Sequence, residues 1–209
     1  MVIANQSLSE YKQTILDLVP DQGHWSDGDY LWLTETTSRL VELTDGTIEV
    51  LPMPTHLHQS IVRFMFLALY GFIAPLGGDA LFSPLRVRIR PGKFREPDVL
   101  AMLNAKDPRC RNRFWAGADL AVEVVSEDKP ERDLVDKRHD YAEGKIPEYW
   151  TANPQNQTIT VLRLDNGVYV EHGVFTRGQR ATSVLLPGFG VNVDEVFNVD
   201  VPADEPGDE

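Results

Sequence analysis

Two short and nearly unbroken apolar runs constrain the fold more than any other feature of this sequence. They are DVLAMLN at residues 98–104 and DLAVEVVS at residues 119–126. A strand with one solvated face alternates apolar and polar residues, whereas a run without alternation is typical of a strand buried on both faces. The sequence therefore predicts two neighbouring strands at the centre of a sheet, with further layers packed on both sides.

The segments around these runs predict more strands and two helices. RLVELTDGTIEVLPMP has two alternating runs around Asp45-Gly46, which indicates a hairpin, and LFSPLRVRIR indicates one strand followed by a turn at KFREP. Apolar residues at helical spacing from Ile61 to Ile73 predict a core helix. A second helix is expected in KPERDLVDKRHDYAEGK, with Gly144 as its left-handed end, and strands are expected in PEYWTAN, TITVLRL and VYVEHGVF. The order β-β-α-β-β-β-α-β-β-β predicts an α/β fold in which helices flank a mixed β-sheet.

Length and charge predict one domain between two acidic ends. We assign residues 1–30 to an N-terminal extension with a possible short helix near Leu8 to Val19, residues 31–199 to the domain, and residues 200–209 to a disordered acidic tail. The formal net charge is −12, of which the two ends carry −4 and −5, so that −3 remains for the domain. A net charge of only −3 on the domain does not by itself exclude a polyanionic partner.

The sequence also predicts a cytoplasmic protein that does not interact with a membrane. The first residues do not show the basic segment and following apolar run of a signal peptide, and no stretch approaches the roughly 18 consecutive apolar residues of a membrane span. The single cysteine gives no disulfide framework. Exposed strands and aromatic residues such as Trp150 are compatible with a homodimer, whose interface the sequence does not locate.

Glu123 is the most informative single residue, because it interrupts the apolar run LAVEVV. An unpaired carboxylate in a buried strand costs several kcal/mol, so a bound cation or a basic partner is expected beside it. The alternative is a hydrogen-bonded or protonated glutamate without a functional role.

Asp98 follows Pro97 at the start of the preceding buried strand, where a carboxylate can point into a cleft. An aspartate at such a position is often only a turn device, but here it pairs with Glu123 on the next strand. Two hard oxygen donors on adjacent strands favour Mg²⁺ or Mn²⁺, which use one or two carboxylates together with water and substrate phosphate. His56 and His58 lack a third ligand, so we interpret them as residues of a helix start and not as a zinc site.

Lys137 lies in the second predicted helix, and Leu134, Lys137 and Tyr141 share the helix face that should turn towards the sheet. A lone lysine on such a face commonly covers the core with its aliphatic stem and keeps its ammonium in solvent. With a buried Glu123 on the strand before this helix, an ammonium directed at that carboxylate is the favoured interpretation, and Tyr141 is interpreted mainly as core packing.

A basic zone adjoins these acids. Residues 86–113 contain nine lysines and arginines and three acids. Within it Arg86, Arg88 and Arg90 alternate with apolar residues, which predicts an exposed basic strand face able to contact phosphates. The same pattern also occurs in strands that only form a soluble surface.

Six motifs follow one another between about Arg39 and Phe197, namely ELTDG, PTHLHQ, REPDVL, LAVEVVS, RDLVDKRHDYAEGKIPEYW and LLPGFGVNVDEVF. Together they resemble the Uma2 family of putative restriction endonucleases, also called DUF820, within the PD-(D/E)xK nuclease superfamily. The resemblance implies a restriction-endonuclease-like core in which Asp98 and Glu123 bind the metal. The superfamily places a lysine two residues after the glutamate, but Val125 stands there, and the resemblance to Uma2 implies that Lys137 replaces it from the next helix.

The resemblance further implies that Glu42 of ELTDG lies near the metal and that the carbonyl of Val124 is a ligand, although Glu42 could also be a solvated strand residue. It implies a Mg²⁺- or Mn²⁺-dependent endonuclease that hydrolyses nucleic acid, with DNA as the expected substrate. The alternative is a non-catalytic DNA-binding or assembly protein on a decayed nuclease scaffold, which would bind without cutting.

Overall fold

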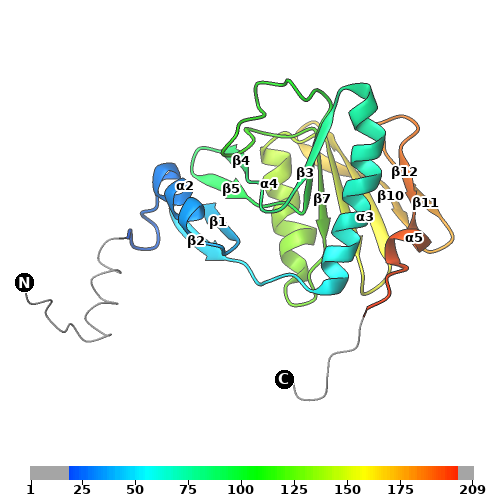
Figure 1. The fold of residues 1–209 in the computed structure, drawn as a ribbon, viewed down its shortest axis with the longest axis horizontal. Helices are drawn as coiled ribbons and strands as arrows, with labels where there is room; N and C mark the ends of the chain where they lie inside the picture. Colours follow the sequence, from blue (N-terminus) through cyan, green and yellow to red (C-terminus); the bar gives the residue numbers. More distant parts are fainter. Residues whose placement is uncertain (1–18, 202–209) are drawn as a thin grey trace, which may run out of the picture.

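The structure, a computed structural model, describes residues 19–201, and its larger β-sheet has six strands in the order β10-β9-β8-β7-β6-β3 (Figure 1). These strands are β3 (Asp79–Phe82), β6 (Val99–Met102), β7 (Leu120–Val124), β8 (Glu148–Asn153), β9 (Thr158–Asp165) and β10 (Val168–Phe175). Only β7 and β8 are parallel, so the sheet is mixed as predicted. Every residue of β6 and β7 is buried, which confirms that the two apolar runs form central strands.

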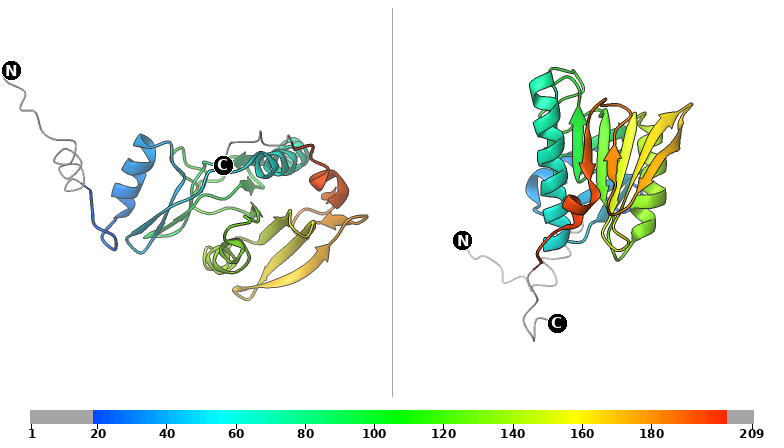
Figure 2. Two further views of the ribbon diagram at one scale, coloured as in Figure 1. Left: turned by 90° about the horizontal axis from the view of Figure 1, so that it is seen from below. Right: turned by 90° about the vertical axis from the view of Figure 1, so that its right-hand side faces the viewer.

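Two helices cover opposite faces of this sheet (Figure 2). Helix α3 (His56–Ile73) packs on one face and helix α4 (Lys137–Glu143) on the other. Side chains alternate along β7, so that Val122 and Val124 join the core beneath α3. Glu123 lies between them in sequence and therefore points to the α4 side of the sheet.

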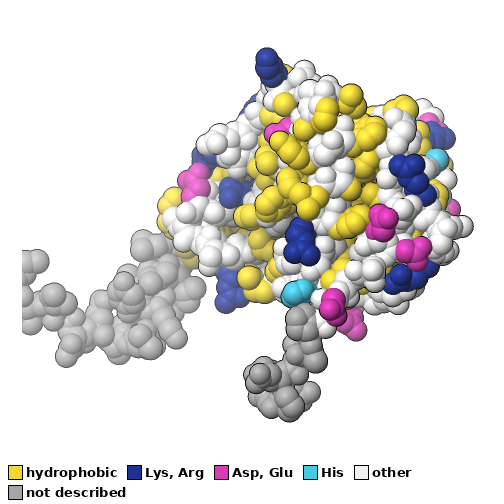
Figure 3. All heavy atoms as spheres, turned by 45° about the vertical axis from the view of Figure 1, so that its right-hand side comes forward, with side chains coloured by type: hydrophobic (Ala, Val, Ile, Leu, Met, Phe, Trp, Pro, Cys, Tyr) yellow, Lys and Arg dark blue, Asp and Glu magenta, His cyan; other side chains and the backbone are white. Residues whose placement is uncertain are grey.

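Helix α3 confirms the predicted core helix and starts behind Thr55, whose hydroxyl accepts the N–H of His58 at 3.2 Å. The segment His56–Leu76 has a mean hydropathy of 1.5 and is, by length and composition alone, able to cross a membrane, contrary to the expectation from sequence. The core helix of a soluble protein passes the same test, and six residues of α3 are buried in the fold. Exposed Leu67 and Tyr70 remain on its outer side, where apolar side chains gather (Figure 3).

A second sheet has four strands in the order β2-β1-β5-β4. They are β1 (Val41–Thr44), β2 (Thr47–Val50), β4 (Val87–Arg90) and β5 (Lys93–Arg95). The predicted hairpin is confirmed, with positive φ angles of 47° at Asp45 and 81° at Gly46. Both angles are those of a tight hairpin turn, which Asp-Gly adopts readily.

Helix α2 (Asp27–Thr36) packs against this smaller sheet and was not predicted. Ser26 caps it and exchanges hydrogen bonds with Asp29. The ring of Tyr30 is buried 4.8 Å from that of Phe94. Most of the possible helix near Leu8 to Val19, and the tail after Val201, lie outside the described residues.

The run at residues 81–90 was expected to be one strand, and this is wrong. It divides at Ser83 and Pro84, so that β3 belongs to the large sheet and β4 to the small one. Pro84 has no N–H to donate and does not continue a ladder. KFREP, expected to be a turn, contains β5. A third sheet of β11 (Arg180–Thr182) and β12 (Gly190–Asn192), and helix α5 (Val193–Phe197), were not predicted.

The second predicted helix is divided into a π-helical turn, Arg132–Asp136, and α4. Leu134 was expected to face inward but is 40% exposed, whereas Asp133 is buried. A π turn has more residues per turn than an α turn, so the residue three positions before Lys137 turns away from the inward side, whereas the residue four positions before it stays there. Gly144 is right-handed and Lys145 adopts the positive φ, at 55°, so the predicted role of Gly144 is also wrong.

Candidate active site

The fold brings Asp98 and Glu123 to the same end of the large sheet. The ladder between β6 and β7 ends at the pair Val99 and Val122, and the next residues of the two strands are these two acids. Asp98 Oδ2 accepts the backbone N–H of Val124 at 2.7 Å. Because the N–H and C=O of one residue point to the same side of an extended strand, the Val124 carbonyl faces the same edge, as a backbone ligand would require.

Lys137 lies at the centre of a buried group of carboxylates. Its Nζ is 2.8 Å from Glu123 Oε2, 3.2 Å from Asp133 Oδ1 and 3.9 Å from Glu42 Oε1. Its side chain is only 3% exposed, so the alternative of an ammonium in solvent is wrong. Burial alone would lower the pKa of Lys137, but Glu123 and the other carboxylates outweigh it and hold that pKa above its ordinary value. The ammonium is therefore charged.

Glu123 is held from two sides. The Tyr141 hydroxyl donates a short hydrogen bond to Oε1, and Lys137 contacts Oε2. Tyr141 is thus both core packing, as predicted, and a direct partner of the site. Burial raises the pKa of Glu123 well above its ordinary value. The positive charge of Lys137 opposes this rise, whereas the negative charges of Asp98 and Asp133 add to it.

The small sheet contributes Glu42 and Glu96, and neither is solvated. Glu42 is 3% exposed, so the alternative of a solvated strand residue is wrong, and its Oε1 accepts the N–H of Glu96 at 3.1 Å. Arg95 Nε lies 3.7 Å from Glu42 Oε2. Burial, assisted by Glu42, raises the pKa of Glu96 to about 8. The two sheets therefore meet at a concentration of negative charge.

His58 comes from the first turn of α3 and was missed as a site residue. Its Nε2 lies 3.2 Å from Asp98 Oδ2, while its Nδ1 is buried without a hydrogen bond partner in the described residues. Burial alone would lower the pKa of His58, but Asp98 outweighs it and raises that pKa. The helix-start interpretation had assigned His58 only to the beginning of α3. The contact with Asp98 joins segments far apart in sequence, and no local pattern indicates it.

Glu148 shows what a purely structural buried glutamate is like in the same sheet. Its oxygens accept four hydrogen bonds of 2.6 to 2.8 Å, from Trp150 Nε1, Ser183 Oγ and the backbone N–H groups of Val184 and Leu185. All four donors are neutral, and together they attach the segment at 183–185 to β8. Glu123 instead has a lysine, a tyrosine and further carboxylates around it, so its environment differs from that of Glu148.

The donor set fits a hard divalent cation such as Mg²⁺ or Mn²⁺. Asp98 Oδ1 accepts no hydrogen bond from residues 19–201, and Glu123 lies beside it. Within that part of the chain no three His, Cys, Asp or Glu side chains are arranged as a metal site of their own. Mg²⁺ commonly takes only one or two carboxylates and fills its remaining positions with water and phosphate. The residues fit such an open site and do not build a closed site of the zinc type.

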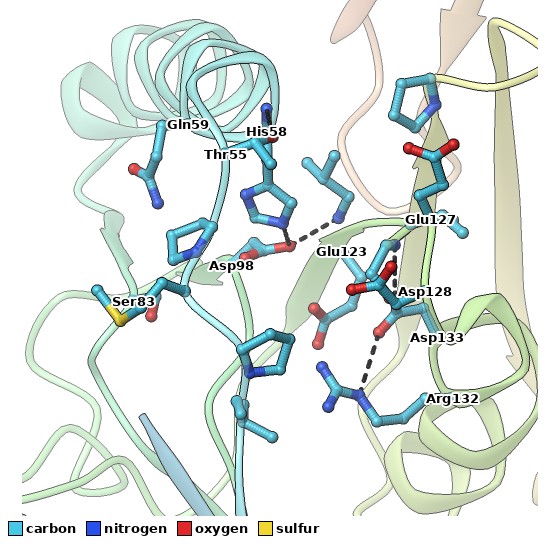
Figure 4. Close-up of a pocket in the computed structure, with 18 of the residues that line it drawn as sticks. Thr55, His58, Gln59, Ser83, Asp98, Glu123, Glu127, Asp128, Arg132 and Asp133 are labelled. Atoms are coloured by element: carbon cyan, nitrogen blue, oxygen red, sulfur yellow. Dashed lines mark hydrogen bonds and ion pairs between the residues drawn. The ribbon is translucent and has the colours of Figure 1, made fainter. Parts of the chain in front are cut away.

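These groups line a cleft of about 200 Å³ between the start of α3 and the π turn (Figure 4). The cleft brings together three of the predicted catalytic residues, Asp98, Glu123 and Lys137. The buried carboxylate of Glu42 reaches this group through Lys137. Asp133, Glu96 and Arg132 also line the cleft, and none of them was identified from sequence.

The predicted basic face of Arg86, Arg88 and Arg90 is not an open surface. Arg86 Nε is 3.7 Å from Glu96, Arg88 is 4.0 Å from Asp27, and Arg90 lies 2.7 Å from both Asp45 and Glu143. Their side chains are 15%, 30% and 34% exposed. The expectation of a solvated face is therefore wrong for Arg86 and only partly met by Arg88 and Arg90, because alternation shows which way a side chain points but not which acids will meet it there.

Comparisons with known proteins agree with this architecture. A crystal structure of a putative nuclease belonging to DUF820 from Anabaena variabilis ATCC 29413 is similar, with a TM-score of 0.68 and 20% identity. The match covers 83% of this chain and 98% of the other. At this identity the likeness shows the fold, and it confirms the predicted fold class. No curated protein matches the chain.

The family model for Uma2, described as "Putative restriction endonuclease", matches residues 27–194. The match includes both sheets, both covering helices and every residue named at the cleft. The chain therefore belongs to the Uma2 family, as its sequence motifs had indicated.

Proposed function

We propose that this protein is a divalent-metal-dependent endonuclease that hydrolyses phosphodiester bonds of nucleic acid, with DNA as its substrate. The observation that supports this most is the meeting of Asp98, Glu123 and Lys137 at one cleft, although they come from two strands and a helix. A lysine beside two acids that can hold a divalent cation is a group of side chains suited to hydrolysis of a phosphodiester.

In this proposal each residue has a distinct task. Asp98, Glu123 and the Val124 carbonyl would hold Mg²⁺ or Mn²⁺, which when bound supplies Lewis-acid stabilisation and lowers the pKa of a water. Tyr141 and Lys137 fix the orientation of the Glu123 carboxylate. Lys137 Nζ lies 2.8 Å from Glu123 and 3.2 Å from Asp133, while Glu42 at 3.9 Å is beyond hydrogen bond distance, and in this proposal the third N–H of the ammonium positions the attacking water.

The reaction adds the oxygen of that water to phosphorus and breaks the bond from phosphorus to one sugar oxygen. The positive charge of Lys137 offsets charge on the phosphate as this happens. The leaving sugar oxygen takes up a proton, and the products are a phosphate end and a hydroxyl end. We leave Arg86, Arg88 and Arg90 out of the proposed phosphate contacts, because none of them lines the cleft.

The test is incubation of the purified protein with supercoiled plasmid, single-stranded DNA and RNA, with Mg²⁺ or Mn²⁺ or with a chelator. Cleavage that requires the cation is expected, and DNA should be cut. Binding without cleavage under every condition would favour the non-catalytic scaffold instead. Cleavage that persists in chelator would contradict the proposed role of the acids.

Metal binding itself should be visible as stabilisation. Added Mg²⁺ or Mn²⁺ is expected to raise the melting temperature, because a ligand at about 100 times its Kd stabilises the folded state by about 2.7 kcal/mol. The double variant Asp98→Asn, Glu123→Gln should no longer respond. Glu171→Gln, an exposed change on β10, is the matched control and should respond like the parent. An equal response in the double variant would place the ion elsewhere.

A further inference from the structure

Arg132 carries the least satisfied charged group at the cleft. Its side chain is only 14% exposed, yet its guanidinium forms no hydrogen bond with any residue from 19 to 201, and its Nε is buried without a partner. The acids near it are Glu49 at 3.8 Å and Asp133 at 4.0 Å, beyond hydrogen bond distance. A guanidinium has five N–H donors in a fixed fork, and a buried donor left unpaired costs about 1–3 kcal/mol.

Two other arginines, Arg90 and Arg95, are satisfied by carboxylates. Arg90 forms hydrogen bonds to Asp45 and Glu143 at 2.7 to 2.9 Å, and Arg95 donates to Asp140 at 2.8 Å. Arg132 differs from both, because its donors are free and its side chain lines the cleft. Figure 4 shows it pointing into the same space as the Glu123 carboxylate.

We propose that Arg132 binds the non-bridging oxygens of the phosphate that enters the cleft, an inference that rests on the proposed nuclease function. The planar fork of a guanidinium matches two phosphate oxygens at once, which makes arginine well suited to this contact. The contact fills the unpaired donors. It also places a second positive charge, beside that of Lys137, where a phosphate must approach the carboxylates of Asp98, Glu123 and Asp133.

The position of Arg132 on the π turn agrees with this role. The turn directs Asp133 and Lys137 to the buried side, while Arg132, one residue earlier, lies at the cleft wall. A purely structural alternative is that Arg132 only offsets the negative charge of the buried acids. The two roles differ in what they predict for phosphate affinity, and the salt dependence of binding separates them.

The experiment compares Arg132→Met and Arg132→Lys with Arg163→Met, an exposed change on β9 outside the cleft. Binding of fluorescein-labelled single-stranded and duplex DNA is measured in a Glu123→Gln background over a range of salt concentrations. Arg132→Met should weaken binding and reduce the slope of log K against log salt by about 0.7 to 0.9, the effect of one phosphate contact. In the cleavage-competent background its kcat/KM should fall by a factor on the order of 10 or more, with partial rescue by lysine.

The outcomes separate the failure of this inference from the failure of the proposed function. A parent that cleaves, together with an Arg132→Met variant that cleaves and binds like Arg163→Met, overturns the inference and leaves the function intact. A parent that binds without cutting, with a reduced salt slope in Arg132→Met, supports the phosphate contact and contradicts the nuclease. A lower melting temperature with an unchanged salt slope shows a structural role and overturns the inference, and a parent that neither binds nor cuts overturns both.

Discussion

Replacement of Glu123 by Gln is expected to abolish metal-dependent cleavage, with kcat falling by a factor on the order of 100 or more. The amide keeps the size of the side chain and its oxygen still accepts the Tyr141 hydrogen bond, but it removes the negative charge that a divalent ion requires. Because burial already raises the pKa of Glu123, a neutral side chain should be tolerated by the fold. Cleavage of supercoiled plasmid in Mg²⁺ is the measurement.

Two controls make this result specific to the site. Glu171→Gln removes an exposed carboxylate on β10 and should retain the activity of the parent. Glu148→Gln alters a buried glutamate with only neutral donors around it, and should lower stability more than activity per folded molecule. A Glu123→Gln variant that is folded and still cuts at the rate of the parent would remove Glu123 from the mechanism.

Replacement of Lys137 by Met is expected to lower the free energy of unfolding by about 3–5 kcal/mol in the absence of metal, because it leaves buried carboxylates without their cation. Glu123 and Asp133 lie within 3.2 Å of the ammonium, and Glu42 lies at 3.9 Å. Urea denaturation at neutral pH is the measurement. The deficit should shrink as pH falls, because burial raises the folded-state pKa of Glu123, and protonation removes its charge before the unfolded chain takes up the same proton.

The double variant Lys137→Met, Glu123→Gln should be more stable than the sum of the two single losses predicts, since the second change removes one uncompensated charge. Lys106→Met, in an exposed turn, is the matched control and should change stability by less than about 0.5 kcal/mol. A Lys137→Met variant as stable as that control would show that the buried ion pairs do not stabilise the fold. Loss of cleavage in a Lys137 variant therefore informs on catalysis only when the variant is shown to be folded.

The centre of the site could be predicted from sequence because its signals are local. A single acid inside LAVEVV has few explanations other than a buried and compensated carboxylate, and Asp98 begins the neighbouring apolar run. Periodicity alone placed Lys137 and Tyr141 on the inward side of the next helix. The family resemblance added Glu42, whose buried position between Lys137 and Arg95 no strand pattern indicates.

The rest depends on contacts between segments that are distant in sequence. Division of residues 81–90 between two sheets follows from a turn at Ser83 and Pro84 that an unbroken alternating pattern conceals. The pairing of His58 with Asp98 joins the start of α3 to the edge of β6. The arginines of β4 find acids on three other segments, and a sequence gives their direction without giving those partners.

The π turn at Arg132–Asp136 limits how the chain can change in length. In a regular α-helix each residue advances the direction of its side chain by about 100°, so an insertion or deletion between Asp133 and Lys137 would turn one of these two side chains away from the other. Leu134 and Val135 point outward and can be exchanged for other residues at little cost. Relatives that keep this site should therefore vary in the identity of those two residues far more readily than in the number of residues between Asp133 and Lys137.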